Sequence, residues 1–473
     1  MYDKIKKVIR LLNLKELIQA TNGTYINGNL DCIPNNYVID SRIIEKNDFF
    51  VPIIGERTDG HEYILDIVPK GISGFFISKS TKNKNYIIDE SIKINKDICI
   101  IEVEDTFKAL YNAGKYNREK NIDIPVVAIT GSVGKTSTRE MVSSVLKQKY
   151  NVLTTEKNYN SLIGVPIMAL KIDKQDICVL EAGIDHFEEM ELLSNVLKPD
   201  VCVITNIGTA HIGTFKSSEN ILKEKIQITN HIKGKSKLII NEDNTYLNKV
   251  EDNITYSVEK IGMDNVSDIK YDDEKIEFVT RIYGEKNKIE INALGNHNIY
   301  NALVSIKVAE IFNMSKEDII KGISEYKNFA RRLEKKITKN NAIIIDDTYN
   351  ASIDSMKSGL ITVNNMKANR KIAVLGDMFD LGEKSDEIHL NLAEVFEILN
   401  YDYLFTLGDA AKKIAIGAKK YMNEKNVLSY DDKKELIDKL KNFIESNDLI
   451  YFKASNGMKF DEIIKELEKR KYE

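Results

Sequence analysis

Residues 125 to about 325 alternate short apolar runs with stretches that carry an apolar residue every three to four positions. The apolar, β-branched runs predict buried strands, and the stretches between them predict helices. The expected strands are 125–130, 151–155, 176–181, 200–205 and 236–240, and the expected helices are 135–149, 162–170, 187–196 and 217–231. This alternation is typical of a doubly wound, mostly parallel α/β sheet, which binds ligands at the C-terminal ends of its strands.

The pattern changes after residue 250 and then returns. Short strands expected near 253–258, 267–272, 276–283 and 286–292 predict a β-rich insert, and a helix over 297–312 is expected to close this unit. From about residue 330 the alternation resumes, with strands expected at 342–346, 371–375, 403–407 and 448–452 and a last helix over 459–471. This second unit is expected to be Rossmann-like, and because it has no GxGxxG motif it is not expected to bind a dinucleotide.

The first 105 residues show a mixed pattern. A short amphipathic helix is expected over about 3–19, followed by strand-like pieces at 37–40, 48–53, 74–77 and 85–88. A helix over about 105–118 and a charged segment at 117–123 are expected to link this unit to the next. The predicted fold class is therefore α/β with three domains, an N-terminal α/β domain (1–105), a central domain (106–328) and a C-terminal Rossmann-like domain (329–473).

Composition narrows the functional classes. The chain has 473 residues, 30% of them charged, and a net charge of −4 with the signs interspersed, so no nucleic-acid-binding face is expected. No apolar run is long enough to span a membrane and no signal-type apolar region follows the first residues, so we expect a cytoplasmic protein without membrane insertion. Cysteines at 32, 99, 178 and 202 lack metal-site spacing and are expected to be reduced thiols.

The clearest chemical pattern follows the first strand of the central unit, where a glycine-rich turn leads into a helix. Its residues are Gly131, Ser132, Val133, Gly134, Lys135, Thr136 and Ser137. Glycines let several backbone N–H groups converge on a phosphate, and the helix N-terminus adds its positive end. Lys135 is expected to reach the β/γ-phosphates of a nucleotide, and the Thr136 hydroxyl is expected to bind Mg²⁺. Ile129 stands where the usual P-loop has its first glycine, so a glycine-rich turn with an unrelated lysine is the alternative.

Two further strand ends of this unit carry polar side chains. Glu181 ends the strand at 176–181, and a carboxylate beside a phosphate loop suits Mg²⁺. His211 follows the strand at 200–205, but Mg²⁺ prefers oxygen, and by pattern alone a hydrogen-bonded structural histidine is favoured. Lys225 lies on the next helix, and by pattern alone it belongs to a solvated face.

Two polar strings in the first unit are candidates for ligand binding. They contain Ser41 and Arg42 in one string, and Gly60 and His61 in the other. Composition alone favours a turn and a polar loop. The functional alternative is an anionic or sugar-nucleotide ligand, which such hydrogen-bond donors would bind.

The order of these motifs resembles that of the Mur ligases, ATP-dependent amide-forming enzymes of peptidoglycan synthesis, over nearly the whole chain. The matching segments are 40–42, 59–61, 130–136, 158–166, 181–183, 205–211, 295–298, 301–303, 332–334, 346–351, 375–378 and 453–458. The family's P-loop is short, which accounts for Ile129. The resemblance implies a UDP-sugar-binding N-terminal domain, a central P-loop ATPase domain and a C-terminal domain that binds the incoming dipeptide.

The resemblance also implies roles for individual residues, with Lys135, His211 and Lys225 as the catalytic set. It implies a carbamylated Lys225 and two Mg²⁺ ions held by Thr136, Glu181, His211 and Lys225. Besides the P-loop, the residues implied to bind ATP are Asn298, Asn301, Arg332, Asp347 and Tyr349. The residues implied to bind substrates are Ser41, Arg42, Gly60, His61, Asn158, Asn160, Asp377 and Lys453.

Within the family the resemblance is to the members that join D-alanyl-D-alanine to UDP-N-acetylmuramoyl-tripeptide through an acyl phosphate. These two substrates and ATP are the expected partners, and a monomer is the expected state. Two positions depart from the family pattern: Ile353 replaces a proline, and Asn456 replaces an arginine. These departures suggest a related ligase with a variant dipeptide or depsipeptide as one alternative. A folylpolyglutamate-synthetase-like ligase and an ATP-binding switch or scaffold are the others.

Overall fold

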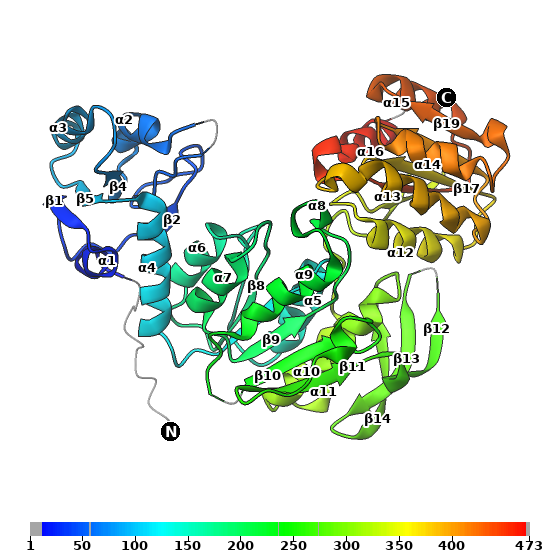
Figure 1. Cartoon of the computed structure of the whole chain (residues 1–473), viewed down its shortest axis with the longest axis horizontal. Helices are drawn as coiled ribbons and strands as arrows, with labels where there is room; N and C mark the ends of the chain where they lie inside the picture. Colours follow the sequence, from blue (N-terminus) through cyan, green and yellow to red (C-terminus); the bar gives the residue numbers. More distant parts are fainter. Residues whose placement is uncertain (1–11, 56–57, 235, 273, 470–473) are drawn as a thin grey trace.

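The computed structural model describes residues 12–55, 58–234, 236–272 and 274–469. They form three α/β units, which follow one another along the molecule (Figure 1) and which we call the N-terminal (12–105), central (106–328) and C-terminal (329–469) domains. The predicted α/β class is confirmed. Within the described ranges, no helix combines the length and the apolar character needed to cross a membrane.

The N-terminal domain is built on a sheet with the order β1-β5-β4-β3-β2, in which β1 pairs antiparallel with β5 and the other neighbours pair in parallel. Its helices and strands are α1 (Leu14–Thr21), β1 (Thr24–Asn27), β2 (Tyr37–Val38), β3 (Phe49–Phe50), α2 (Ile64–Ile67), β4 (Gly74–Ser78), α3 (Lys84–Ile94) and β5 (Cys99–Val103). Of the predicted helix at 3–19, residues 1–11 lie outside the described part. Phe76 faces one apolar cluster and Phe75 the other, so β4 is buried on both faces.

The strand expected at 85–88 is wrong, because these residues belong to α3. Ile88 and Ile92 are one helical turn apart, and both pack on the apolar cluster that contains Phe75. The run of three apolar residues therefore belongs to the buried face of a helix. Over so short a stretch, the sequence pattern cannot distinguish a buried strand from a buried helix face. Strands β1 and β5 were not predicted.

The prediction of a linker at 117–123 is also wrong in part, because helix α4 (Thr106–Lys120) continues to residue 120. The buried Asn117 amide donates to the carbonyl oxygens of Ala169 and Ile172 at 2.8 and 2.9 Å. Helix α4, the first helix of the central domain, thus packs on the rest of that domain and also on α1 of the N-terminal domain.

The central sheet has six parallel strands in the order β11-β10-β9-β6-β8-β7. The strands are β6 (Val126–Thr130), β7 (Val152–Thr154), β8 (Ile177–Glu181), β9 (Val201–Ile204), β10 (Ser236–Asn241) and β11 (Tyr256–Ile261). The main helices are α5 (Lys135–Leu146), α6 (Gly164–Leu170), α7 (Glu189–Leu197), α8 (Ile212–Phe215), α9 (Ser218–Lys225), α10 (His297–Ile311) and α11 (Lys316–Ser324). Val127 packs toward α5 and α10, whereas Val126 packs toward α6 and α7, so helices cover both faces as predicted.

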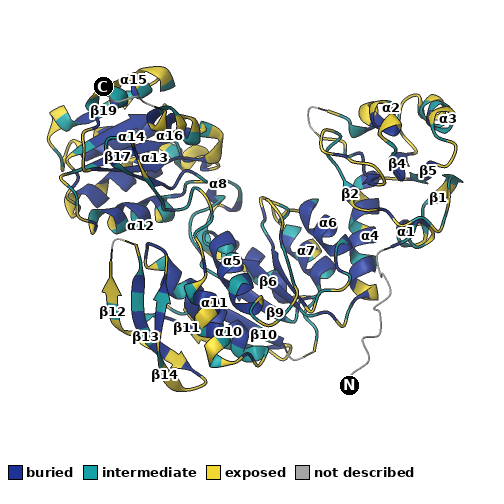
Figure 2. Cartoon of the chain, turned by 180° about the vertical axis from the view of Figure 1, so that it is seen from behind, coloured by how far each residue is buried: buried dark blue, intermediate teal, exposed yellow. Residues whose placement is uncertain are grey.

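The β-rich insert is smaller than expected. The strand expected near 253–258 is β11, which extends the central sheet beside β10 instead of joining the insert. The insert is the antiparallel sheet β12 (Ser267–Tyr271), β13 (Ile276–Ile282) and β14 (Glu285–Ile291). Figure 2 shows its outer strand β12 largely exposed.

The C-terminal sheet has the order β15-β16-β20-β17-β18-β19, with β15 antiparallel and the others parallel. The strands are β15 (Glu334–Ile337), β16 (Ile343–Asp346), β17 (Arg370–Gly376), β18 (Tyr403–Leu407), β19 (Val427–Tyr430) and β20 (Asp448–Lys453). The helices are α12 (Ile353–Asn364), α13 (Ser385–Leu392), α14 (Ala411–Ala418), α15 (Lys433–Phe443) and α16 (Phe460–Glu468). Strands β15 and β19 at the edges were not predicted, and of the last predicted helix, residues 470–471 lie outside the described part.

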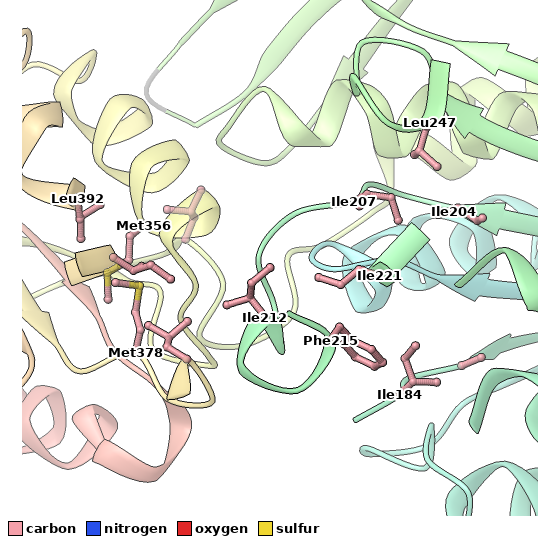
Figure 3. Packing of buried hydrophobic residues seen from close by; sticks show 14 of the residues in the cluster. Ile184, Ile204, Ile207, Ile212, Phe215, Ile221, Leu247, Met356, Met378 and Leu392 are labelled. Carbon is pink, nitrogen blue, oxygen red and sulfur yellow. The ribbon is translucent and has the colours of Figure 1, made fainter. Parts of the chain in front are cut away.

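The central and C-terminal domains meet at α8. Figure 3 shows Ile212 between Phe215 of the central domain and Met356 and Met378 of the C-terminal domain, within one apolar cluster. A Cβ placed on Gly213 would lie 2.9 Å from the backbone nitrogen of Gly382. The two backbones therefore approach each other closely at this point, and a larger side chain would push the domains apart.

Candidate functional site

The glycine-rich turn leaves β6 at the centre of the central sheet and ends at the first turn of α5. Gly131 has φ +149°, and a Cβ there would lie 1.9 Å from Thr205 Oγ1 at the end of β9. Thr205 Oγ1 donates to the Val133 carbonyl at 2.6 Å, and Val133 N donates to Asn206 Oδ1 at 2.9 Å. The end of β9 thus fixes the loop, and only glycine fits at its first position.

Lys135 is the first residue of α5 and lies within the loop. Its Nζ donates to the Gly131 carbonyl at 2.7 Å. Burial lowers the pKa of the Lys135 ammonium, and the nearby Glu181 carboxylate opposes that shift. A phosphate placed in the loop would give the ammonium a stronger acceptor than a carbonyl, because charge-assisted hydrogen bonds are the stronger ones.

Glu181 ends β8 and divides its two oxygens between different partners. Oε2 accepts from Thr136 Oγ1 at 3.3 Å and from Asn160 Nδ2 at 3.2 Å. Oε1 lies 3.1 Å from Nη1 of Arg139, and both side chains are 2% exposed. Oε2 therefore faces the loop, whereas Oε1 is held by an arginine.

His211 lines the cavity described below, whereas Lys225 is buried and does not line it. His211 Nδ1 is 3.4 Å from Asp185 Oδ1, and burial lowers the pKa of this imidazole against the effect of Asp185. Lys225 is 2% exposed, and within the described ranges its ammonium has no hydrogen bond or ion pair. Burial, followed by the charge of Lys135, lowers the pKa of Lys225 well below its usual range. The solvated-face interpretation of Lys225 is therefore wrong.

The C-terminal domain contributes charged residues opposite the loop. Asp347 Oδ2 accepts from Lys453 Nζ at 2.6 Å and from the Tyr451 hydroxyl at 2.9 Å. The guanidinium carbon of Arg332 lies 4.3 Å from the centroid of the Tyr349 ring, and Arg332 Nε is buried with no hydrogen-bond partner among the described residues. An unpartnered, buried guanidinium N–H is a donor for an anionic or polar ligand.

A cavity of about 460 Å³ joins these groups between the central and C-terminal domains. The predicted site residues that line it are Ser132, Val133, Gly134, Lys135, Thr136, Ser137, Asn160, Glu181, His211, Asn301, Arg332, Asp347, Tyr349 and Lys453. The volume lies within the range of small-molecule and nucleotide sites. Most of the predicted ATP and metal residues are thus brought together.

The two asparagines of α10 have different positions. Asn301 lines the cavity and accepts from Thr138 Oγ1 at 2.7 Å, whereas its Nδ2 donates to Asn298 Oδ1 at 3.0 Å. Asn298 is fully buried, and its Nδ2 donates to the Leu294 carbonyl at 2.7 Å. Asn298 therefore orients Asn301, and Asn301 is the one exposed to a ligand.

The predicted substrate residues of the N-terminal domain lie away from this cavity. Arg42 is 86% exposed and forms a two-point ion pair with Asp40. His61 is buried, with Nδ1 2.6 Å from Asp59 Oδ1 and Nε2 accepting from Ser78 N at 3.1 Å. Both ring nitrogens of His61 are engaged within the protein, so His61 supports the fold of its turn, and a ligand would have to contact its neighbours.

The remaining predicted residues differ in exposure. The Ser41 carbonyl accepts from Lys70 Nζ at 3.0 Å, and Gly60 packs its backbone against Ile53. Asn158 is exposed next to the cavity residue Asn160. These placements leave their predicted roles as predictions.

Asp377 has a clear structural partner. Its Oδ1 accepts from Ala411 N at 2.7 Å at the start of α14, and burial raises the pKa of its carboxyl. It does not line the cavity, although it follows β17 on the edge of the sheet where Lys453 ends β20. The neighbouring Phe379 and Asp380 do line the cavity, so this loop faces the site with residues that sequence reasoning missed.

Other missed residues are Asp185, His297, Asp354 and Arg139. Burial lowers the pKa of His297 to about 4, with Asp347 opposing and Arg332 adding to the shift. His297 belongs to the recognised segment 295–298, which was the available signal for it. Arg139 is four residues after Lys135, so one helical turn separates them, but a single arginine at that spacing carries no distinctive signal.

The side chains beside the phosphate loop offer oxygen ligands for one Mg²⁺ ion. Within the described ranges no group of three or more His, Cys, Asp and Glu side chains is placed to hold a metal ion. Thr136 Oγ1 and Glu181 Oε2 nevertheless offer two oxygens beside a phosphate loop, and Mg²⁺ usually takes few protein oxygens and completes its shell with phosphates and water. A single Mg²⁺ therefore fits here, whereas Lys225 would need to lose its positive charge to hold another.

The chain matches two family models in succession. The Mur ligase middle domain matches residues 129–309, and the Mur ligase glutamate ligase domain matches residues 331–456. These ranges lie within the two domains that line the cavity.

The chain is also similar over nearly its whole length to curated proteins named UDP-N-acetylmuramoyl-tripeptide–D-alanyl-D-alanine ligase. The protein of Bacillus subtilis (strain 168) is 33% identical over 459 residues, which cover 96% of this chain and 98% of that protein. The protein of Buchnera aphidicola subsp. Acyrthosiphon pisum is 32% identical over 468 residues, with the same two coverages of 96% and 98%.

Solved structures agree with these relatives. A crystal structure of MurF from Acinetobacter baumannii superposes with a TM-score of 0.85 at 26% identity and covers 98% of this chain and 100% of that chain. The MurF ligase of Thermotoga maritima in complex with ADP superposes with a TM-score of 0.78 at 25% identity, over 92% of this chain and 97% of that chain.

Proposed function

The chain belongs to the Mur ligase family, and on that premise we propose that it joins D-alanyl-D-alanine to UDP-N-acetylmuramoyl-tripeptide, with ATP converted to ADP and phosphate, as a step of peptidoglycan precursor synthesis. Relatives that match it over nearly their full length carry this activity in their names. The family's members are ATP-dependent ligases, and a related structure holds ADP.

One observation carries the proposal. The same cavity is lined by a phosphate loop from the central domain and by Arg332, Asp347 and Lys453 from the C-terminal domain. A ligase that activates a carboxylate must hold ATP, acid and amine close together while the activated acid is protected from water. A cavity enclosed by two domains meets this need, whereas a simple nucleotide switch needs only the loop.

The reaction needs an activated acid, because a carboxylate is a poor electrophile. The terminal carboxylate oxygen of the tripeptide attacks the γ-phosphorus of ATP, the bond to the β–γ bridging oxygen breaks, and ADP leaves. The amine nitrogen of D-alanyl-D-alanine then attacks the carbonyl carbon of the acyl phosphate. The C–O bond breaks, phosphate leaves and the new amide nitrogen loses a proton.

The residues of the chain act mainly by position and charge, as is usual for phosphoryl transfer. Lys135 and the N–H groups from Gly131 to Ser137 would hold the β- and γ-phosphates. Arg332, Tyr349 and Asn301 would contact the nucleoside portion. Asp347 with Lys453 lies where the C-terminal domain faces the reacting groups.

Mg²⁺ is part of this proposal. Thr136 and Glu181 would hold one ion, and His211 and Lys225 would hold a second. When bound, Mg²⁺ neutralises the negative charge that the phosphates carry. His211 is less suited to this metal than an oxygen ligand would be.

Lys225 would serve as a ligand after carbamylation. A neutral amine can attack CO₂ to form a carbamic acid, which loses a proton and becomes an oxygen anion. Lys225 favours this reaction because it is buried and because burial, more than the opposing charges of Asp185 and Glu224, lowers its pKa well below the usual range. The product supplies the oxygen donor that Mg²⁺ prefers.

The domain roles follow from the same proposal. Residues 1–105 would bind the UDP-sugar through Ser41, Arg42, Gly60 and the turn of His61, residues 106–328 would bind ATP, and residues 329–473 would bind the dipeptide. The cavity is complete within one chain, so a monomer suffices. ATP and nucleotide-linked sugars are cytoplasmic substrates, so we propose the cytoplasm as the compartment.

The alternatives remain distinguishable. Ser352 caps α12 with its side chain, so Ile353 replaces the proline without loss of the helix start. Residues 12–105 form a full α/β domain before the ATPase domain, which a folylpolyglutamate-type ligase would not need. A variant amine substrate stays open and is tested by comparing D-alanyl-D-alanine with D-alanyl-D-lactate.

Phosphate release from ATP tests the proposal. We expect release only when both UDP-N-acetylmuramoyl-tripeptide and D-alanyl-D-alanine are present, with one amide product formed per phosphate. Phosphate release that does not require both substrates, or release without amide product, would contradict the proposed ligase activity.

A further inference from the structure

Two residues in left-handed conformation flank Arg332 in the segment that joins the central and C-terminal domains. Arg331 has φ +65° and Leu333 has φ +48°. Side chains other than glycine rarely adopt such values, and each costs on the order of 1 kcal/mol or more unless its surroundings hold it. Strain of this kind is often found beside functional residues, and here it surrounds one that lines the cavity.

The contacts of Arg331 account for the conformation. Its Nε donates to Thr348 Oγ1 at 2.9 Å, and its Nη2 donates to the Thr348 carbonyl. Its Nη1 donates to Asn456 Oδ1 at 3.2 Å. On the main chain, Tyr349 N donates to the Arg331 carbonyl at 3.1 Å, and Arg331 N donates to Glu334 Oε2 at 2.9 Å. Arg331 is thus fastened to the strand end that carries Tyr349.

The anchor points are themselves rigid. Thr348 is fully buried, and its hydroxyl donates to Asp346 Oδ1 at 2.6 Å. Asp346 in turn pairs with Lys336 on the neighbouring strand at 2.9 Å. The guanidinium of Arg331 therefore rests on a hydrogen-bonded network that is anchored, through Asp346 and Lys336, on strands β16 and β15.

The residues on either side of these contacts form one wall of the cavity. Arg332 lies over the ring of Tyr349 at 4.3 Å, and Phe329 meets the same ring edge-on at 5.6 Å between centroids. Arg331 itself does not line the cavity. Its side chain and carbonyl hold residues 348–349, and its backbone conformation directs Arg332 toward Tyr349.

We propose that Arg331 is a positioning residue for the nucleotide and that Asn456 is its matched acceptor. This inference rests on the proposed function, which places the nucleotide against Arg332 and Tyr349. It also accounts for the asparagine at 456: an arginine there would face the Arg331 guanidinium with a like charge, whereas the asparagine amide oxygen accepts a hydrogen bond from it. In this proposal Asn456 supports the cavity wall formed by Arg332 and Tyr349, through Arg331, and does not select the dipeptide.

Arg331→Gly is the first test, because glycine adopts positive φ without strain and only the guanidinium contacts are lost. We expect the KM for ATP and the Kd for Mg·ADP to rise about tenfold, equivalent to the loss of one or two charge-assisted hydrogen bonds. The kcat and the KM for D-alanyl-D-alanine should stay within about twofold, since nothing that contacts the reacting groups has changed.

Moving the arginine from position 331 to position 456 is the second test. Asn456→Arg alone should raise the KM for ATP about fivefold through like-charge repulsion with Arg331. The double variant Arg331→Gly/Asn456→Arg should return to within about threefold of the parent enzyme, because an arginine at 456 can supply a guanidinium at the same acceptors. Such recovery reports coupling between the two positions, which two independent structural defects would not show.

Lys459→Gly is the matched control, because Lys459 also has positive φ (+52°) in the same domain. It should leave the KM for ATP unchanged. An Arg331→Gly enzyme with parental Mg·ADP affinity, or with equal increases in the KM for ATP and for the dipeptide, would overturn the inference. If Arg331→Gly does not fold, Asn456→Arg decides by itself, and a parental KM for ATP in that variant overturns the inference.

The two proposals fail in different ways. If the parent enzyme does not form the amide, the proposed function is lost, but Mg·ADP titration of the variants still decides the role of Arg331. If the parent enzyme forms the amide and the Arg331 variants bind Mg·ADP as the parent does, only the positioning role is lost.

Discussion

Asp354 of the C-terminal domain accepts a hydrogen bond from the backbone N–H of Thr209 in the central domain at 3.2 Å. The same carboxylate oxygen lies 3.4 Å from the Thr209 hydroxyl. A Cβ on the adjacent Gly208 would come within 2.4 Å of it. A polar contact thus joins the two domains. It lies beside the phosphate loop, since Gly208 N donates a hydrogen bond to Ser132 Oγ of that loop at 3.0 Å.

We predict that Asp354→Ala and Gly208→Ala both weaken closure of the two domains, the first by removing the acceptor and the second by excluding it. The KM for ATP should rise about five- to tenfold in each, as expected for one charge-assisted hydrogen bond. Small-angle X-ray scattering with Mg·ADP should show a larger radius of gyration than the parent enzyme has. Unchanged scattering and an unchanged KM would show that the contact does not stabilise closure.

Lys135→Ala should lower kcat by about 10³-fold or more, because it removes the cation next to the transferred phosphoryl group. The fold should persist, since among the described residues the Lys135 side chain donates one hydrogen bond, to the loop carbonyl of Gly131. Amide formation and circular dichroism check the two statements. A Lys135→Ala enzyme that keeps a tenth of the parental kcat would remove Lys135 from the catalytic set.

Lys225 should carry a carbamate that depends on CO₂. Enzyme equilibrated with ¹³C-bicarbonate should show a carbamate resonance in ¹³C NMR, and Lys225→Ala should lack it. Removal of CO₂ should lower activity, and bicarbonate should restore it. Lys223 is the control, because this neighbour on α9 is exposed to solvent, so Lys223→Ala should retain the resonance.

Arg139 should stabilise the fold through the Glu181 carboxylate. Removing one partner of a buried ion pair costs about 3–5 kcal/mol, so Arg139→Leu should lower the free energy of unfolding by that order. Arg139→Leu/Glu181→Gln should recover part of the loss, since the uncompensated charge is gone. Arg281→Leu, at an exposed arginine, should change stability by about 0.5 kcal/mol or less. Urea denaturation measures all three, and equal losses in the single and double variants would contradict the pairing.

His297 should make the fold sensitive to acid. Its pKa is lowered from 6.5 to about 4, chiefly by burial, so between these pH values the unfolded state binds more protons than the folded state. Stability from the neutral imidazole is therefore present above pH 6.5 and falls as the pH drops toward 4, by up to about 3 kcal/mol at 1.36 kcal/mol for each pKa unit. Urea midpoints of the parent enzyme and His297→Asn should converge at low pH. Parallel curves would exclude His297 as the cause.

Hydrophobic pattern predicted the parts of the fold that repeat. The five strands from β6 to β10 lie where their apolar runs predicted them. For β6, β8 and β9 the reason is that a strand buried on both faces must be apolar throughout. Edges were harder to predict. Strand β15 contains Glu334 and two lysines, and its pairing with β16 depends on the tertiary fold and not on its own composition.

The residues of the candidate site likewise differ in how well the sequence predicted them. The phosphate loop could be recognised because its chemistry needs glycines and a lysine at fixed spacing. Lys225 could not, because its burial depends on how α9 packs, and a lysine in a helix looks the same whether it is solvated or buried. Asp354 could not either, because its partner Thr209 belongs to another domain, 145 positions away in the chain.

The division of the cavity between two domains has a consequence for idle turnover of ATP. The central domain by itself holds the phosphate loop and Glu181, and it can bind a nucleotide. Arg332, Asp347 and Lys453 arrive only with the C-terminal domain. Under the proposed function, an enzyme whose domains are apart would hold ATP without the groups that we propose for its use, and ATP would then not be hydrolysed between encounters with the acid and the amine.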